Sequence, residues 1–127
     1  ILDAGYPTWL LSYWSRDKEI FSLEDSIRRL TSDTASAIGL YDRGAIKEGL
    51  KADINILDIE NLGSSDPYML KDLPAGGSRL MQKTSGYVAN IVSGKITYVK
   101  GKKENILPGK LVKLINIQQK FKEKDLV

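Results

Sequence analysis

Residues 43–58 read RGAIKEGLKADINILD and mark the point at which the pattern of the chain changes. Before this stretch apolar residues recur at helical spacing, whereas after it they fall in short β-branched runs. Gly44 predicts a turn, and Ile54 and Ile56 lie on one face of a predicted strand. Ile46 indicates a second, shorter strand. The sequence therefore predicts a mixed α+β chain in which helices come before a small sheet.

Two or three helices are expected before this stretch. Residues 7–14 predict the first, because a proline suits the first helical turn and the segment is apolar on most faces. Ser22 and Asp25 approximate a capping box at the start of the second helix. That helix should stop near Thr31-Ser32. A third short helix should start there, capped by Ser32 or Thr31, and end at Gly39.

A hairpin is the clearest signal after the stretch. Residues 87–100 are two β-branched runs joined by Ser93-Gly94, which is typical of a two-residue hairpin turn. Residues 60–77 resemble a loop, with one helical turn expected over residues 68–71. A last amphipathic helix is expected over residues 111–124.

Composition excludes several kinds of chemistry. The chain has 127 residues, a net charge of +3 and neither His nor Cys. A Ser-His-Asp triad, a thiol nucleophile and a Cys- or His-based metal site therefore cannot be built from this chain alone. No apolar run approaches the ~18 residues of a membrane-spanning helix, so no membrane partner is expected.

The predicted sheet is too small to be self-contained. Three or four strands need a partner layer, and this order of elements matches no small fold that closes on itself. The chain opens at Ile1 without an initiator methionine and without a signal-peptide pattern. We therefore expect a piece of a longer cytoplasmic protein, in which other strands complete the sheet.

The carboxylates admit two interpretations. Asp53 and Asp58 bracket the predicted strand, and Asp42 and Asp66 fall in turns. A pair of them could serve as general acid and base. Alternatively, each caps local backbone, as Asp commonly does at turns and strand ends.

Three other groups of residues also admit a functional and a structural interpretation. Residues 72–79 carry a Gly pair and an Arg, which suits either an anion-binding nest or a sharp connecting turn. Basic residues at 100–103 and 110–124 suit either nucleic acid or a solvated surface, and no aromatic residues are interleaved with them. The aromatic residues of 6–14 suit either a ligand pocket or packing against a larger body.

Residues 23–35, 39–58, 72–77, 86–94 and 107–112 together resemble the C-terminal end of metal-dependent amidohydrolases. The run Arg-Gly-x-Ile-x-x-Gly-x-x-Ala-Asp at residues 43–53 carries the resemblance to the superfamily. The branch that the chain resembles most is that of the N-acyl-D-amino-acid deacylases, or D-aminoacylases.

The resemblance implies an α/β parent with a (β/α)₈ barrel and a small composite β-sandwich. Residues 1–44 would then be the last barrel helices, 45–113 the C-terminal sandwich strands, and 114–127 a terminal helix or tail. The parent would hold zinc or another divalent metal through His residues that this chain lacks. Its expected partners are the rest of the parent chain and a small amide substrate, with no nucleic acid.

The resemblance leaves no catalytic, cofactor-binding or metal-binding residue in this chain, and Asp3 is the one candidate at the rim of the pocket. Asp3-Ala4-Gly5 resembles the run that holds the family's catalytic Asp. In relatives, however, that Asp lies further before the aromatic-Pro-Thr segment than Asp3 does, so Asp3 is expected in the loop that follows.

The function expected for the parent is hydrolysis of a linear amide, with the chain alone structural and inactive. The alternatives are a cyclic-amide hydrolase of the dihydropyrimidinase or dihydroorotase type, or a stand-alone anion- or nucleic-acid-binding module. Unpaired strand edges and exposed aromatic residues also predict self-association into a homo-oligomer.

Overall fold

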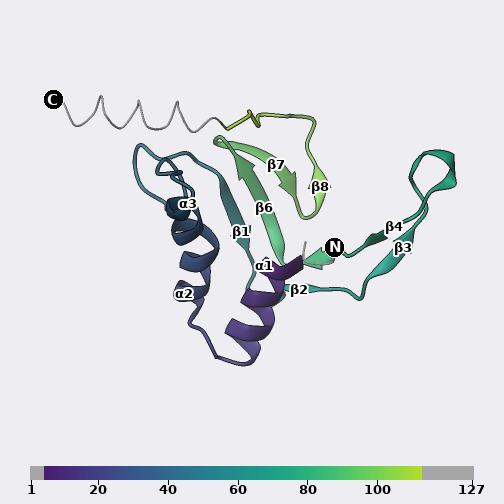
Figure 1. Ribbon diagram of the computed structural model, residues 1–127, viewed down its shortest axis with the longest axis horizontal. Helices are drawn as coiled ribbons and strands as arrows, with labels where there is room; N and C mark the ends of the chain where they lie inside the picture. The colour runs from purple at the N-terminus through teal and green to yellow at the C-terminus, as the bar shows by residue number, and fades with distance from the viewer. Residues whose placement is uncertain (1–4, 113–127) are drawn as a thin grey trace.

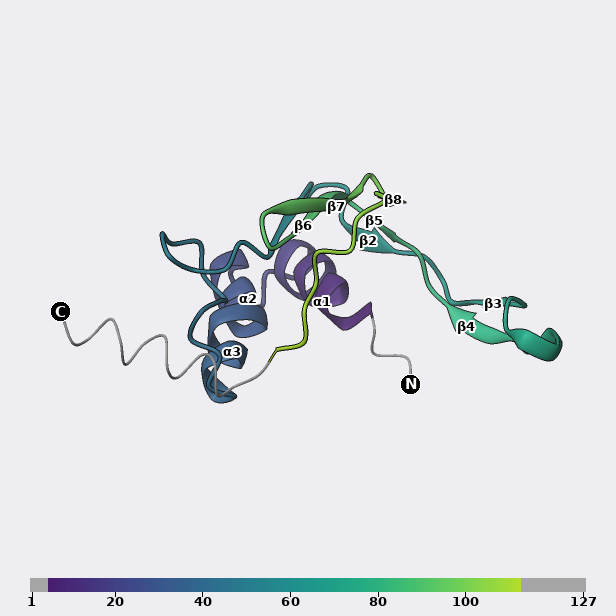
Figure 2. The same ribbon diagram turned by 90° about the horizontal axis from the view of Figure 1, so that it is seen from above.

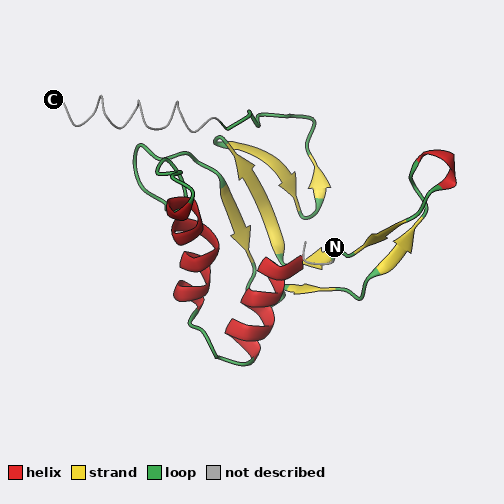
Figure 3. Cartoon of the chain, in the orientation of Figure 1, coloured by secondary structure: helices red, strands yellow, loops and turns green. Residues whose placement is uncertain are grey.

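The computed structural model of the chain describes residues 5–112 (Figure 1). Two helical segments lie beside a four-stranded antiparallel sheet, and a two-stranded ribbon projects away from both (Figures 1 and 2). Helices precede strands along the chain, as Figure 3 shows. The mixed α+β prediction is therefore confirmed.

The first helical segment begins with α1 (Tyr6–Trp9) and continues without a break as η2 (Leu10–Asp17), which has the wider winding of a π-helix. Pro7 occupies its first turn, where the missing N–H has no helical partner to lose. The buried residues of this segment are three small polar residues and one leucine, and their spacing places them on one face of the helix. They are Thr8, Leu11, Ser12 and Ser15. Most of the aromatic side chains therefore remain on the solvent side.

The second helical segment comprises α2 (Leu23–Arg28), η3 (Arg29–Asp33) and α3 (Thr34–Ala37). The Ser22 hydroxyl accepts a hydrogen bond from the amide of Asp25 at 3.1 Å, which confirms the predicted cap. Gly39 ends the segment with a φ of +76°, which confirms the predicted stop.

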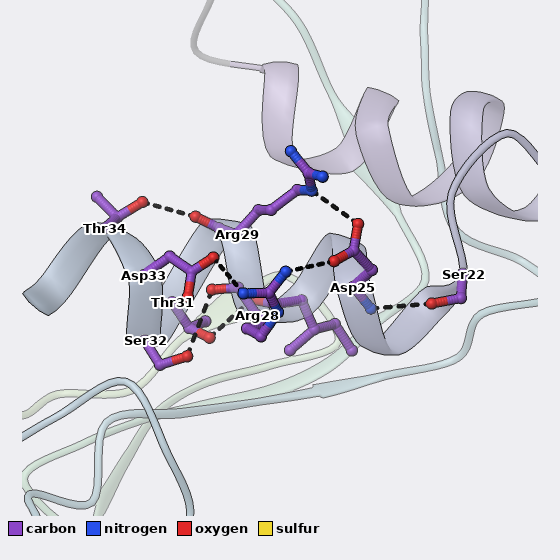
Figure 4. Close-up of polar contacts among 9 residues, drawn as sticks. Ser22, Asp25, Arg28, Arg29, Thr31, Ser32, Asp33 and Thr34 are labelled. Carbon is purple, nitrogen blue, oxygen red and sulfur yellow. Dashed lines mark hydrogen bonds and ion pairs between the residues drawn. The ribbon is translucent and has the colours of Figure 1, made fainter. Parts of the chain in front are cut away.

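The predicted break at Ser32 is wrong, because the segment runs on to Ala37. The hydroxyls expected to cap a new helix bond instead to carbonyls of the preceding turn (Figure 4). Thr31 donates to Ile27 O at 2.7 Å and Ser32 to Arg28 O at 3.5 Å.

Ion pairs line the exposed side of the same helix. Arg28 bridges Asp25 at 2.6 Å and Asp33 at 2.8 Å, and Arg29 reaches Asp25 at 2.7 Å (Figure 4). Hydrogen bonds from the two guanidinium groups lower the pKa of Asp25. These pairs are solvated, so they stabilise the helix locally rather than forming a reactive site.

The main sheet has the strand order β1-β6-β7-β8 and is antiparallel throughout. Its strands are β1 (Ile54–Leu57), β6 (Tyr87–Val92), β7 (Lys95–Val99) and β8 (Lys102–Lys103). Ser93 and Gly94, with φ of +51° and +74°, form the turn between β6 and β7. The predicted strand and hairpin are therefore confirmed.

The strand predicted around Ile46 is not formed. The backbone of residues 42–51 bonds within itself, since Lys51 N–H donates to Asp42 O at 2.7 Å and Leu50 N–H donates to Lys47 O at 3.1 Å. Those groups are then not free for a sheet ladder, and the Ile46 side chain is 87% exposed. This segment is a loop that connects the helices to the sheet.

Residues 60–77 contain short strands where a loop was expected. β2 (Gly63–Ser64) pairs with β5 (Thr84–Ser85), and β3 (Tyr68–Leu70) pairs with β4 (Arg79–Met81). The helical turn expected over 68–71 is therefore wrong. A turn of 3₁₀ helix, η4 (Pro74–Gly76), lies instead at the tip of the ribbon.

The helices contact the sheet through a few specific polar contacts. The hydroxyls of Thr8 and Tyr87 are 2.9 Å apart, and Arg16 donates to the carbonyls of Ile59 and Leu62 at 2.8 and 2.7 Å. Leu62 is 1% exposed beneath this contact. Arg16 thus ties the first helical segment to carbonyls of the turn after β1.

The apolar core is small. Among the described residues, the buried apolar side chains are Leu11, Ala35, Leu62 and Ala89, of which Leu62 alone is fully buried. The predicted helix over 111–124 begins at residues that are not helical, Leu111 and Val112, and the rest of it lies outside the described residues, as does Asp3.

Candidate functional site

The densest group of partly buried charges lies where the connecting loop meets the β6–β7 turn. We call Asp42, Arg43, Lys51, Asp53 and Ser93 the junction cluster. Asp53 accepts from the Ser93 amide at 2.8 Å, and its other oxygen lies 2.7 Å from Lys51 Nζ. Arg43 pairs with Asp42 at 2.8 Å and approaches Asp53 at 3.7 Å.

The electrostatics of the cluster keep both carboxyl groups ionised. Burial alone would raise the pKa of Asp53, but hydrogen bonds from Lys51 and the Ser93 amide, together with the charge of Arg43, lower it. A hydrogen bond from Arg43 is the main cause of the lowered pKa of Asp42. Neither carboxyl group can act as a general acid near neutral pH.

The cluster instead fastens the loop to the hairpin. Gly94 N–H donates to Ala52 O at 2.9 Å, beside the bond from Ser93 to Asp53. Gly44, with a φ of +93°, passes so close to the second helical segment that a β-carbon there would lie 2.8 Å from Ser32 Cα. The run at residues 43–53 therefore joins the helices to the sheet.

Of the predicted carboxylates, Asp42 and Asp53 share Arg43 in the junction cluster, whereas Asp53 and Asp58 are not brought together. Asp53 and Asp58 lie beyond opposite ends of β1, and Asp58 accepts from the Asn61 side chain at 2.8 Å. Hydrogen bonds from Asn61 lower the pKa of Asp58. The capping interpretation is the one that these contacts support.

A concavity of about 820 Å³ lies beside the main sheet, over β1, β6 and β7. Its polar lining includes Asn55 and Asn90, whose side-chain amides bond to each other at 2.6 Å. Asp58 is the one carboxylate among its lining residues, and Lys100 lies at its edge. The concavity could accept a polar group, but its lining provides no acid and base pair.

The predicted anion nest at 72–79 is occupied by internal bonds. Arg79 donates to both oxygens of Asp72, at 2.8 and 2.6 Å, and lowers the pKa of that carboxyl. Leu73 N–H donates to Gly77 O, and Gly77 N–H donates to Pro74 O. These groups are therefore committed to the turn and not to an anion.

The aromatic residues of the first helix stack on one another instead of lining a pocket. Trp9 stacks on Tyr13 with ring centroids 4.5 Å apart, and Trp14 meets Tyr13 edge-on at 5.2 Å. Lys18 lies 5.4 Å from the centre of the Tyr13 ring. Tyr6 and Trp9 are largely exposed, which leaves an apolar helix face toward solvent.

The basic residues of the hairpin are solvated. Lys102 and Lys103 are exposed in β8, at the edge of the main sheet. Most of the other predicted basic cluster, at 110–124, falls outside the described residues.

The described residues do not fit a catalytic metal. Within 5–112, no group of three or more carboxylates lies close enough together to hold a metal ion, and the chain has no His or Cys. No step through a metal is therefore derived from these residues. Within the same range, no helix is both long and apolar enough to cross a bilayer.

Comparison with known proteins places these features in a family. The family model described as the amidohydrolase family matches residues 4–98, which is most of the chain. The chain belongs to the amidohydrolase family. The matched region contains both helical segments, the junction cluster and the projecting ribbon.

The amidohydrolase chain is similar to several curated dihydroorotases. It is 30% identical over 105 residues to the dihydroorotase of Lactobacillus acidophilus, an alignment that covers 80% of this chain and 24% of the relative. It is 39% identical over 88 residues to that of Bacillus thuringiensis, covering 65% of this chain and 19% of the relative. The chain thus spans a quarter or less of these relatives, and no solved structure matches it.

Sequence analysis missed the partners of Asp53. Lys51 precedes it by two residues, a spacing that suggests no special contact. Ser93 lies 40 residues away and contributes a backbone amide, which has no signature in a sequence. The Ser93-Gly94 turn was the available signal, because a tight turn exposes amides that need acceptors.

Proposed function

We propose that this amidohydrolase chain is the C-terminal part of a metal-dependent hydrolase that opens a cyclic amide, as its dihydroorotase relatives are named for doing. The observation that carries the proposal is the family match over residues 4–98 together with the names of those relatives. In the proposal, the metal ligands belong to the rest of the protein, which we call the catalytic body. The catalytic body comprises the residues that precede Gly5.

The role proposed for the chain itself is structural. The partly buried charged groups of the junction cluster are committed to one another, and the carboxylates of Asp42 and Asp53 are held ionised by guanidinium, ammonium or amide donors. Such groups suit holding a loop on a sheet better than exchanging protons with a substrate. In this proposal the helices end the barrel, and the main sheet is part of a composite sandwich.

Hydrolysis of a linear N-acyl-D-amino acid is the second candidate. The run at residues 72–77 and the run at 107–112 resemble deacylases of that branch, and the first of these runs forms the tip of the ribbon. The two candidates share the same bond type and differ in whether the amide lies within a ring.

The experiment compares both substrates on the whole protein. Zinc-loaded protein that contains the catalytic body and this chain is given dihydroorotate and, separately, N-acetyl-D-methionine. Ring opening is followed by chromatography, and release of the free amine by a colorimetric assay. The proposal predicts faster ring opening. Faster amine release would move the assignment to the linear amide, and hydrolysis of neither substrate would overturn both.

A further inference from the structure

The projecting ribbon is the least covered part of the molecule. We call residues 65–83 the arm, which contains β3, η4 and β4. The arm points away from the helices and from the main sheet in both views (Figures 1 and 2). Its strands pair mainly with each other, with Met69 opposite Leu80 in the register.

The arm carries apolar side chains on both faces. Met69 and Leu80 form a cross-strand pair on one face and are 64% and 44% exposed. On the other face, Tyr68 lies opposite Met81, and Leu70 lies opposite Arg79. An isolated two-stranded ribbon is marginally stable in water, so a ribbon with two apolar faces needs a surface to pack on.

The geometry of the arm is well defined despite this exposure. The Asp72–Arg79 pair closes its tip, and Lys83 lies 5.7 Å from the centre of the Tyr68 ring. At its base, Ser65 N–H donates to Lys83 O at 2.8 Å. These contacts hold the shape of the arm but leave Met69 and Leu80 exposed on one face, whereas Tyr68, Leu70 and Met81 on the other face are half-buried.

The base of the arm is also where the chain enters the structure. A β-carbon placed on Gly5 would lie 2.5 Å from Oε1 of Gln82, and Gln82 itself donates to Ser65 O at 2.9 Å. Gly5, the first described residue, therefore lies at the base of the arm. A body tethered there has a high effective concentration at the exposed faces of the arm.

We propose that the arm packs against the catalytic body of its own polypeptide. This inference rests on the proposed function, in which the catalytic body precedes Gly5. The curated relatives extend well beyond the part that this chain matches, so a body of sufficient size is available in a protein of their length. The contact would cover Met69, Leu80 and Leu73, which is 43% exposed near the tip.

Amide hydrogen exchange tests the contact directly. Exchange in residues 66–83 is measured by mass spectrometry in dilute, monomeric whole protein, first unchanged and then carrying Met69→Asp. The arm should exchange at least about tenfold more slowly in the unchanged protein, because packing suppresses local opening. The β6–β7 hairpin is the internal control, because its amides already pair within the chain and should change much less.

Two outcomes would overturn the inference. Equal exchange of the arm in both proteins would show that nothing covers it. Protection that depends on protein concentration and appears only in oligomeric fractions would assign the arm to a second copy instead.

Variants make the test specific. Met69→Asp should restore fast exchange in the arm of the whole protein, while Ile46→Asp, at an exposed site outside the arm, should not. Unchanged protection in Met69→Asp would contradict the proposed contact. Met69→Leu, which keeps the apolar surface, should retain the protection.

The inference and the proposed function fail separately. If the whole protein hydrolyses an amide but its arm is not protected, the proposed contact is wrong and the proposed function stands. If the arm is protected but the whole protein hydrolyses neither substrate, the proposed function is wrong and the proposed contact stands.

Discussion

Asp53 shows how an ionised residue can be central to this chain without being catalytic. Its carboxylate accepts from a backbone amide of a tight turn and from a lysine, and it faces a guanidinium. The Ser93 amide lies in an exposed turn, and the Asp53 side chain is 31% exposed. The bond from Ser93 spans 40 residues, so among the contacts of Asp53 it is the one that joins the connecting loop to the hairpin.

Replacing Asp53 tests the contribution of these contacts. Asp53→Ala should lower the free energy of unfolding by about 1 kcal/mol, because the hydrogen bond from Ser93 and the pairs with Lys51 and Arg43 are lost together. Asp53→Asn should cost less, since the amide oxygen can still accept. The matched control is Asp66→Ala, an exposed carboxylate that makes no ion pair within the described residues. Urea unfolding measures all three, and an Asp66→Ala effect as large as that of Asp53→Ala would contradict the account.

The lowered pKa of Asp53 also predicts a pH dependence with a definite sign. A carboxyl whose pKa falls on folding stabilises the protein fully above its unfolded pKa, near 3.8, and loses that contribution as pH falls through the folded value. Stability should therefore drop below about pH 4. Urea midpoints at pH 7, 4 and 3 measure this drop, which should be smaller in Asp53→Asn. An identical drop in that variant would assign the acid sensitivity to other carboxyl groups.

At the scale of elements, two glycines with positive φ have different surroundings. Gly86 joins β5 to β6 at a φ of +81°, and a β-carbon there would lie 2.5 Å from Leu62 Cα. Gly94 in the hairpin turn has a φ of +74° and open space around it. The first position needs glycine for both conformation and space, whereas the second needs it for conformation alone.

Alanine at the two positions separates these causes. Gly94→Ala should cost about 1–2 kcal/mol, the price of a left-handed backbone for a residue with a β-carbon. Gly86→Ala should cost about 3 kcal/mol or more, because the backbone of Leu62 must also move. Thermal unfolding compares them, and equal losses in the two variants would refute the close approach at Gly86.

Elements with local signals were predictable from the sequence, and elements made by distant contacts were not. The Ser22 cap, the Gly39 stop and the Ser93-Gly94 turn each depend on residues within one turn of chain. The helix runs on past Ser32 because hydroxyls there bond back to earlier carbonyls, an option that a sequence does not distinguish from capping.

The arm and the loop around Ile46 are two places where the sequence pattern did not predict the structure. The strands β3 and β4 have three residues each and pair across separations of 9 to 13 residues, so they are too short for a periodic pattern to predict them. Ile46 has the β-branched character of a strand residue, but its backbone neighbours bond within the loop. The junction cluster was likewise hidden, because it joins residues from three parts of the sequence.

At the scale of the molecule, the chain leaves much apolar surface open. Tyr6 and Trp9 on the first helix, Ile56 and Ile96 on the main sheet, and Met69 on the arm are all exposed. Monomeric proteins rarely leave such surfaces uncovered. This exposure agrees with the proposal that the catalytic body covers these faces in the whole protein.

The chain on its own should therefore self-associate. Sedimentation velocity of residues 1–127 over a range of concentrations should show mass-action growth, driven by open strand edges and the exposed aromatic face. Trp9→Ser should reduce the growth, whereas Ser36→Ala, which alters an exposed site without removing apolar surface, should not. A chain that stays monomeric at high concentration would contradict the proposal that its exposed apolar surface is normally covered by the catalytic body.

The most direct test of the central claim compares the metal content and activity of the chain with those of the whole protein. Both are prepared with zinc, dialysed, analysed for bound metal and assayed for amide hydrolysis. The account predicts that the whole protein retains zinc and hydrolyses an amide, while residues 1–127 alone retain no stoichiometric zinc and hydrolyse nothing. One tightly held zinc per isolated chain, together with turnover, would contradict it.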